Sequence, residues 1–375
     1  MIPLARPRIP EAAQAGIREV LDSGMLVEGA RARAFAEALA AYTGAPHAVL
    51  VNSGTSALWM ALKALGIGEG DLVLVPAYTF PATANAVLLA GAEPVFADVD
   101  PGTWNLDAAT AAARLAGLAP SRRRRVKAVM PVQAFGNPVD MRPLLALARR
   151  HRLKVVEDAA CALGSTYHGR ACGTHGDVGC YSFHPRKVLT TGEGGALVTR
   201  SNALARSLAL LKNHGMTPRK GKPGRMAFLS PGMNLRFTEV AAVLGISQLE
   251  TFAASLEERR ALAERYAAGL QSLGGEIQRQ VPGGRTNWQA LVARLPLRSA
   301  TARDRLLAAL AAHGVQATIG TYLVPAEPAF RALNGGARHP AAEALMRQAV
   351  ALPFYPGLGP AGVDAVLEAL RGCLA

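Results

Sequence analysis

The chain has 375 residues, of which 50% are hydrophobic and 18% are charged. A chain of this length exceeds the size at which one hydrophobic core stops growing, and its composition excludes an intrinsically disordered protein, so we expect a folded, soluble protein of two lobes. The formal net charge of +14 would attract nucleic acid or a nucleotide-linked ligand, but no recognisable nucleic-acid-binding motif accompanies it.

The cysteines show no pattern of metal ligands or of disulfide pairs. They lack the C-x-x-C spacing, so we expect neither a zinc site nor a disulfide framework, and no metal. The first residues contain no hydrophobic segment of signal-peptide length, and no apolar run is long enough to cross a membrane. We therefore expect a cytoplasmic protein with no membrane partner. The four cysteines are Cys161, Cys172, Cys180 and Cys373.

Helical and strand patterns alternate through the first two-thirds of the chain. This alternation predicts a mostly parallel sheet that is covered by helices on both faces. Gly24 and Gly44 are expected to end the first two helices. The predicted helices are 11–23, 31–42, 56–65, 83–89 and 141–151, and the predicted strands are 47–51, 72–75, 94–98, 126–132, 154–158, 179–183 and 195–199.

The pattern changes near residue 250, where we place a domain boundary. Residues 238–273 read as one long helix or as a broken pair of helices. Beyond them we predict strands at 288–295 and 315–319 and helices at 300–313, 341–352 and 361–374. The arginine run 122–125 is interpreted as a solvated loop, because charge runs are usually exposed.

One lysine lies in a segment that suits covalent chemistry. Lys187 ends the run 182–187 and is followed by the glycine-rich turn 191–195. A lysine amine that condenses with an aldehyde is what pyridoxal phosphate (PLP) chemistry needs. Taken alone, Lys187 would be read as a surface lysine, because most lysines are exposed.

Asp158 ends an apolar strand, at the edge where ligand sites of parallel sheets lie. A carboxylate at this place suits a pyridine nitrogen, which it would keep protonated. The alternative is that Asp158 caps the turn that follows. Glu157 precedes it and faces the opposite side of the strand, so it is the weaker candidate.

The turn 52–56 lies between a predicted strand and a predicted helix, where free N–H groups suit a phosphate. Thr55, Ser56 and Ser182 offer hydroxyl groups to the same phosphate. A plain strand-to-helix turn with a serine cap is the competing interpretation. Phe80 follows another strand and is read either as a face that stacks on a pyridine ring or as a core residue.

Together these segments closely resemble the nucleotide-sugar aminotransferases of the DegT/StrS type, which are fold-type-I PLP enzymes. The resemblance implies an α/β protein with a mostly parallel seven-stranded sheet in a large domain, residues 1–250, and a smaller C-terminal α+β domain, residues 251–375. Six blocks in this order are a specific signature, and they span nearly the whole chain. The blocks are 53–58, 76–80, 91–100, 157–160, 182–195 and 232–236, with a further likeness at 352–357.

The resemblance also implies a role for each site residue. Lys187 would form a Schiff base with PLP and shuttle the substrate proton, and Asp158 would bind the pyridine nitrogen. The remaining cofactor-binding residues would be Gly54, Thr55, Ser56 and Ser182 at the phosphate, Phe80 on the ring, Cys161 near the phenolic oxygen, and Asn234 at the phosphate of the neighbouring subunit's cofactor. A homodimer with shared active sites follows from the role of Asn234. Cys161 is a departure, because the family commonly has Gln or His there and a thiol is a weak hydrogen-bond partner.

The implied activity is transfer of an amino group from L-glutamate, or glutamine, to a keto sugar, with a nucleoside diphosphate as the expected carrier. Basic residues in 219–225 would meet the diphosphate or form a solvated surface. One alternative is a PLP-dependent sugar dehydratase, which is disfavoured because Lys187 is retained and the cysteines are scattered. Another is a non-catalytic, basic, nucleic-acid-binding or regulatory protein on the same fold. The substrate segment 320–327 lacks the histidine that the family often carries, so the sequence does not identify the sugar.

Overall fold

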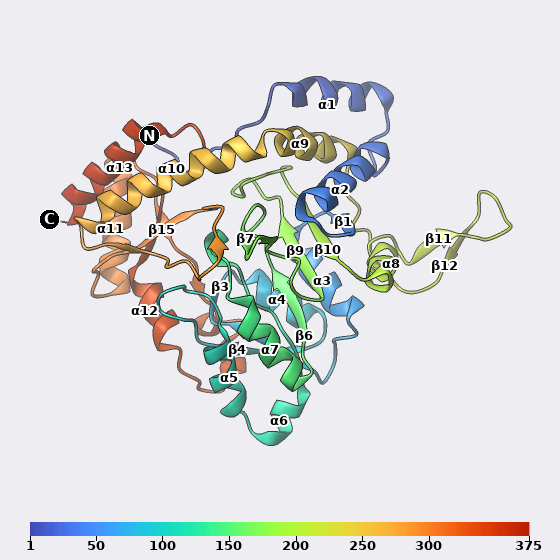
Figure 1. The fold of residues 1–375 in the computed structure, drawn as a ribbon, viewed down its shortest axis with the longest axis horizontal. Coiled ribbons are helices and arrows are strands. Elements are labelled where there is room, and N and C mark those ends of the chain that lie inside the picture. Colours follow the sequence, from blue (N-terminus) through green and yellow to red (C-terminus); the bar gives the residue numbers. More distant parts are fainter. Residues whose placement is uncertain (375) are drawn as a thin grey trace.

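A seven-stranded, mostly parallel β-sheet forms the centre of the chain, of which the computed structural model describes residues 1–374 (Figure 1). The strand order is β1-β10-β9-β6-β5-β2-β4, and within the described residues β10 alone runs antiparallel to its neighbours. The predicted sheet is thus confirmed. Its strands are β1 (His47–Val51), β2 (Leu72–Pro76), β4 (Glu93–Ala97), β5 (Val126–Val129), β6 (Lys154–Asp158), β9 (Val178–Ser182) and β10 (Gly195–Thr199).

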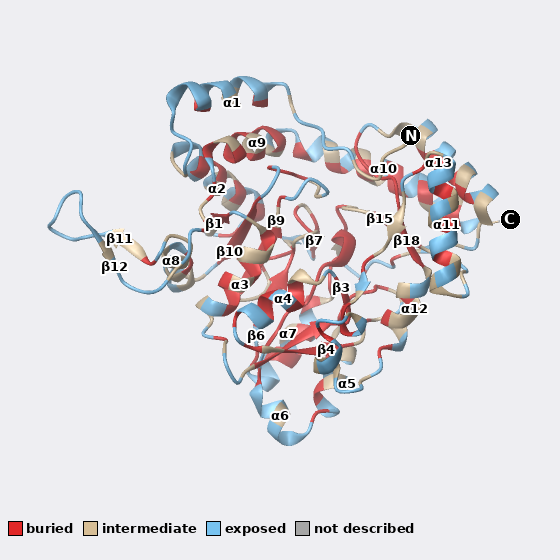
Figure 2. Cartoon of the chain, turned by 180° about the vertical axis from the view of Figure 1, so that it is seen from behind, coloured by how far each residue is buried: buried red, intermediate tan, exposed pale blue. Residues whose placement is uncertain are grey.

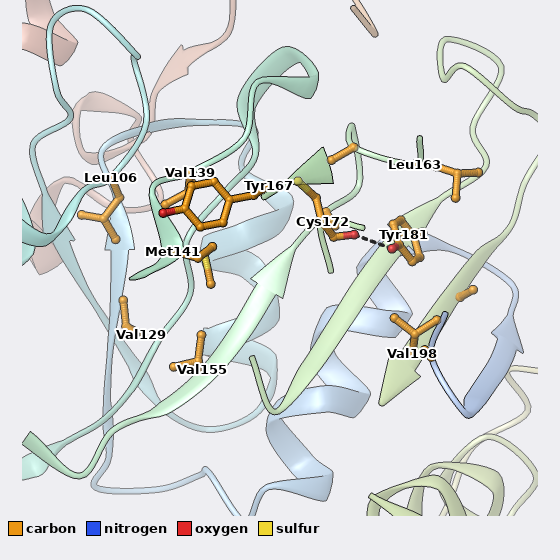
Figure 3. Close-up of a cluster of buried hydrophobic side chains, with 14 of the residues drawn as sticks. Leu106, Val129, Val139, Met141, Val155, Leu163, Tyr167, Cys172, Tyr181 and Val198 are labelled. Atoms are coloured by element: carbon orange, nitrogen blue, oxygen red, sulfur yellow. Dashed lines mark hydrogen bonds between the residues drawn. The ribbon is translucent and has the colours of Figure 1, made fainter. Parts of the chain in front are cut away.

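Both faces of this sheet are buried, because successive side chains of each strand pack into different cores. Val155 of β6 lies in one hydrophobic cluster, which Figure 3 shows, and the next residue, Val156, lies in the other. One face is covered by α2 (Ala30–Thr43), α5 (Ala108–Ala116) and α7 (Met141–His151), and the other by α3 (Gly54–Ala64), α4 (Ala82–Leu89) and α8 (Asn202–Leu211). The predicted stops at Gly24 and Gly44 are present, and both glycines have left-handed backbone angles.

A second, antiparallel sheet lies in the C-terminal part of the chain, in agreement with the predicted α+β region. Its strand order is β13 (Glu276–Ile277), β15 (Leu291–Arg294), β18 (Ala349–Leu352) and β16 (Thr318–Ile319). Its core is shared with α10 (Phe252–Gln271), α11 (Ala300–Ala312) and α13 (Gly359–Leu374). The domain boundary near residue 250 stays a prediction. It coincides with the break at Thr251 between α9 (Glu239–Glu250) and α10, so the predicted long helix is a broken pair.

Three local predictions are corrected by the structure. The helix predicted at 341–352 ends early, as α12 (Pro340–Gln348), and residues 349–352 form the buried strand β18 between β15 and β16. A short apolar run carries no periodicity that separates helix from strand. The arginine loop is the helix α6 (Pro120–Arg125), since proline suits the first helical position and arginine propagates a helix well. The strand predicted at 126–132 stops at Val129.

A hairpin of β11 (Met216–Pro218) and β12 (Met226–Phe228) projects from the body of the molecule (Figures 1 and 2). The sequence patterns did not predict it. Several apolar side chains on and beside it are exposed, among them Phe228 and Leu229 at 69% and 65%. The helix α1 (Ala12–Ser23) packs on α9 at the same end of the molecule as α10 (Figure 1).

Short pairs of strands connect the two parts of the chain. β14 (Gly284–Arg285) pairs with β7 (Thr166–Tyr167), which also pairs with β8 (Arg170–Ala171), and β17 (Tyr322–Leu323) pairs with β3 (Tyr78–Thr79). Short 3-10 helices lie at Ala134–Gly136, Val324–Ala326 and Arg331–Asn334. Within residues 1–374, no helix has both the length and the apolarity needed to cross a bilayer.

Candidate active site

Asp158 lies at the carboxyl end of β6, and its side chain is almost completely buried, with 4% exposed. The Thr83 hydroxyl donates a hydrogen bond to Oδ2 over 2.8 Å, and the Ala160 N–H donates one to Oδ1 over 3.2 Å. Burial raises the pKa of Asp158, while these two hydrogen bonds and the positive charge of Lys187 lower it, and the net shift is upward. Asp158 is therefore a desolvated carboxyl group that would gain from a further positively charged partner.

Glu157, the neighbouring carboxylate, is fully buried and points to the opposite side of β6. It accepts hydrogen bonds from the backbone N–H groups of Gly173, His175 and Gly176 over 2.8, 2.6 and 2.7 Å. It also accepts one from Nε2 of Gln133 over 3.1 Å. Glu157 therefore holds the loop before β9, and its oxygens are fully used by the protein.

Lys187 lies in the turn after β9, at the same end of the sheet as Asp158. Its backbone N–H donates to the His184 carbonyl over 2.8 Å, which closes the turn. Its Nζ donates to Sγ of Cys161 over 3.0 Å. The structure thus brings three predicted site residues together, since Cys161 follows Asp158 by three positions and Lys187 acts electrostatically on Asp158.

The amino end of α3 offers free N–H groups beside Ser182. Ser53 caps the helix by accepting from the Ser56 N–H over 3.0 Å, and the first intrahelical bond runs from the Ala57 N–H to the Ser53 carbonyl. The N–H groups of Gly54 and Thr55 precede that bond, at the positive end of the helix. Ser56 is less free than predicted, because its hydroxyl lies 2.9 Å from that of Ser53.

Gly54 is required by close packing at this helix end. A Cβ atom at Gly54 would lie 2.7 Å from Cβ of Ser182, nearer than real Cβ atoms approach. β9 and the start of α3 therefore meet closely, and the Ser182 hydroxyl lies next to the free N–H groups. This cradle suits a phosphate group.

Phe80 comes directly after β3, and its ring is 62% exposed. It meets the Tyr322 ring edge-on, with 6.0 Å between the ring centroids. The interpretation of Phe80 as a core residue is therefore wrong, and its exposed ring suits stacking on a ligand. Tyr322 and Thr83 were missed in the sequence. Thr83 contacts a residue 75 positions away, and no local pattern signals such a contact.

Asn234 is the one predicted site residue for which a single chain gives no partner within the site. It is exposed, and its backbone forms a bridge with Asn213 near the base of the hairpin. Its predicted contact lies in a neighbouring subunit, so its role stays a prediction. Among residues 1–374, no cluster of three or more His, Cys, Asp or Glu side chains is arranged to hold a metal ion.

The chemical groups that these residues present are suited to PLP. A desolvated carboxyl suits a protonated ring nitrogen, a lysine amine suits an aldehyde, and a glycine-lined helix end suits a phosphate. The residues that would hold PLP are Lys187, Asp158, Phe80, Gly54, Thr55, Ser56, Ser182 and Cys161.

Comparisons with known proteins find relatives along nearly the whole chain. The model of the DegT/DnrJ/EryC1/StrS aminotransferase family matches residues 7–371. The chain is 37% identical to the GDP-perosamine synthase of Caulobacter vibrioides over 98% of its length and 97% of that protein. It is 36% identical to a UDP-N-acetyl-3-dehydro-alpha-D-glucosamine 3-aminotransferase of Acidithiobacillus ferrooxidans, over 96% and 93% of the two chains.

Solved structures resemble the whole fold. The aminotransferase TlmJ of Streptoalloteichus hindustanus superposes with a TM-score of 0.90 at 33% identity, over 100% of this chain and 99% of that one. The PLP form of the protein Spr1654 of Streptococcus pneumoniae superposes with a TM-score of 0.91 at 26% identity, over 100% of this chain and 98% of that one. The same protein has also been solved in a pyridoxamine phosphate form.

Proposed function

Because the chain belongs to the DegT/DnrJ/EryC1/StrS aminotransferase family, whose members use PLP, we propose that it aminates a keto sugar carried by a nucleoside diphosphate. L-glutamate is the proposed amino donor, and glutamine is the alternative. The names of two relatives, a GDP-sugar and a UDP-sugar enzyme, support the substrate class. The observation that carries the proposal is that Lys187, the buried Asp158 and the glycine-bearing end of α3 come from the same end of the central sheet, with Lys187 acting electrostatically on Asp158 and Gly54 packed against Ser182.

Bound at this site, PLP would supply an aldehyde for the amine and an electron-withdrawing ring that makes the substrate's α-proton acidic. Asp158 would pair with the positively charged ring nitrogen. This pairing would offset the free-energy cost of keeping a desolvated negative charge on Asp158. The Thr83 hydroxyl fixes the orientation of that carboxylate through its 2.8 Å hydrogen bond. Gly54, Thr55 and Ser182 would bind the phosphate and so fix the position of the cofactor.

Lys187 is the proposed acid and base. Its Nζ is held by Cys161 Sγ at 3.0 Å, so the amine has one weak acceptor within the described residues and is not locked in an ion pair. The Lys187 amine would take the proton from the substrate carbon and would later return it, as a single general acid and base. This role separates the proposal from the dehydratase alternative, in which no lysine is needed at this position.

We also propose that the working unit is a homodimer. Exposed apolar residues gather on and near the projecting hairpin, which is typical of an interface. Asn234 lies at the base of that hairpin and would reach the partner's cofactor phosphate. Light scattering on the PLP-loaded protein should give twice the chain mass, and a monomer at micromolar concentration would reject this part of the proposal.

A spectroscopic titration tests the activity. L-glutamate added to the yellow PLP-loaded protein should bleach the absorbance and release 2-oxoglutarate in equal amount. A keto-sugar nucleotide should then restore the absorbance, and screening GDP-, UDP- and dTDP-linked sugars would identify the acceptor. No bleaching with either glutamate or glutamine would reject the proposed reaction, and salt-sensitive DNA binding without bleaching would favour the nucleic-acid alternative.

A further inference from the structure

A cavity of about 300 Å³ adjoins the Lys187 segment, and the residues that line it include five cationic side chains and no acidic one. It lies between the segment 185–190, the junction of α9 and α10, the N-terminal segment 5–10 and the residues 354–356. The cationic residues are Arg6, Arg8, Arg186, Lys187 and Arg259. The residues that form the phosphate cradle and the Asp158 site do not line it. A cavity of one charge sign is a binding site for ions of the opposite sign.

Arg259 is the unusual member of this group, because it is an arginine with only 5% of its surface exposed. Its Nη1 donates to the carbonyls of Trp288 and Gln289 over 3.0 and 3.4 Å, while its Nε has no hydrogen-bond partner among the described residues. The guanidinium carbon lies 5.5 Å from the centre of the Phe354 ring. Burial lowers the pKa of Arg259 to about 10, and the charge of Glu258 acts in the opposite direction, so the group stays charged at neutral pH.

The nearby carboxylate, Glu258, pairs with only one of the five cations of the cavity, Arg8. Glu258 forms an ion pair with Arg8 over 3.0 Å and also accepts from the Gly357 N–H. Arg6 and Arg186 are exposed, and no ion pair involves either of them within residues 1–374. Buried charges in proteins are normally paired, because desolvation is costly. Arg259 has no ion-pair partner among the described residues, so it brings a buried positive charge to the cavity that would attract an anion.

We infer that this cavity is an oxyanion subsite, in which Arg6, Arg186 and Arg259 bind a carboxylate or phosphate group of a substrate. Arginine presents paired N–H groups that match the two oxygens of either group. Two sources supply such a group in the proposed reaction: the carboxylate of the amino donor and the diphosphate of the acceptor. The inference rests on the proposed function only for the identity of the substrate, because the cavity and its charges are properties of the chain.

The test variants remove cationic side chains of the cavity and are chosen so that the protein still folds. The double substitution Arg6→Ala with Arg186→Ala removes two exposed cations and no described hydrogen bond of their guanidinium groups, so the fold should be kept. Arg259→Met removes the buried cation and retains much of its volume, and its unfolding midpoint must be measured because two carbonyl contacts are lost. Arg149→Ala on α7 is the matched control, since Arg149 is an exposed arginine outside the cavity.

Inorganic phosphate is the first probe, and the PLP-loaded protein is used so that the cofactor's own phosphate occupies the end of α3. Calorimetry should show phosphate binding to the parent protein, at least tenfold weaker binding to the double variant and to Arg259→Met, and a change of less than twofold for Arg149→Ala. Absence of phosphate binding to the parent, or equal binding to all the variants, would overturn the inference.

L-glutamate and the free diphosphates UDP and GDP are the second probes, and they distinguish the two sources of the anion. If the variants need more glutamate than the parent for half-maximal bleaching but bind UDP and GDP as tightly as the parent, the subsite binds the donor carboxylate. If the variants lose affinity for UDP or GDP but respond to glutamate as the parent does, the subsite binds the diphosphate. If the variants match the parent with both glutamate and the diphosphates, the cavity has no role in substrate binding. If phosphate binds as expected but the parent does not react with glutamate, the proposed function fails and the anion site stands.

Discussion

Two adjacent carboxylates, Glu157 and Asp158, should respond in opposite ways to the same isosteric substitution. Glu157 uses both oxygens to hold four donors, whereas Asp158 holds two and is desolvated. Glu157→Gln should therefore destabilise the cofactor-free protein, and Asp158→Asn should leave its stability equal or higher. Each residue is a control for the other, because both lie on β6 and both are buried.

The magnitude for Glu157→Gln follows from the number of donors that lose an acceptor. The amide keeps one oxygen, which can still serve His175 and Gly176, while its NH2 group faces the N–H of Gly173 and the amide of Gln133. Gln133 cannot turn to accept without giving up its bond from the Val139 N–H. Two buried donors are left unpaired, and at about 1–3 kcal/mol each the loss is about 2–6 kcal/mol.

Asp158→Asn retains acceptable partners, because its Nδ2 can donate to the Thr83 hydroxyl, which can in turn donate to Thr79 Oγ1 at 3.0 Å. The pKa of Asp158 is raised in the folded, cofactor-free protein. The stability linked to this group is therefore present below the unfolded pKa of about 4 and is lost as pH rises through the raised folded pKa. The advantage of Asp158→Asn over the parent should grow with pH across that window and then level off.

Urea denaturation of the cofactor-free proteins, followed by circular dichroism between pH 4 and 8, measures both effects. The same preparations, loaded with PLP, should show that Asp158→Asn has lost turnover although it is stable. A Glu157→Gln protein as stable as the parent, or an Asp158→Asn protein destabilised by several kcal/mol at neutral pH, would refute the assignment of the two roles.

Substitutions at three further positions test the remaining parts of the site. Lys187→Ala should keep the circular dichroism spectrum and lose turnover, and near-parental activity would remove its proposed role. Gly54→Ala should cost about 1–3 kcal/mol of stability through overpacking against Ser182 and weaken PLP binding in a fluorescence titration, whereas unchanged PLP affinity would contradict the phosphate cradle. Thr83→Val removes a hydrogen bond to a charged acceptor, worth about 1.5–3 kcal/mol, and should lower the affinity for PLP. Thr83→Ser keeps the hydroxyl and should retain the parental affinity. Equal PLP affinities of the two variants would exclude the role of the hydroxyl.

Much of the site could be predicted because its residues belong to local motifs at strand ends. Asp158 ends a strand of five residues, four of them buried, and Gly54 opens a capped helix, and both patterns are visible within a few residues. The order of the strands across the sheet then brings Asp158 and Lys187 to the same edge. The resemblance to a family added the cofactor roles that these patterns leave open.

The parts that the sequence left unpredicted depend on contacts between distant residues. Thr83 is recognisable as a partner of Asp158 only after the fold brings it to the carboxyl end of β6. The strand β18 reads as helix because four buried apolar residues follow a helix without a break, and only its pairing with β15 and β16 decides its conformation. Arg259 appears in the sequence as one charge in a helix of mixed charge, and its burial depends on the carbonyls of residues 288 and 289.

The most direct test of the account is the identity of the residue that carries the cofactor. Reduction of the PLP-loaded protein with borohydride, digestion and mass spectrometry should place the phosphopyridoxyl group on Lys187 with close to one group per chain. Label on another lysine, or no label in protein saturated with PLP, would contradict the assignment of this site.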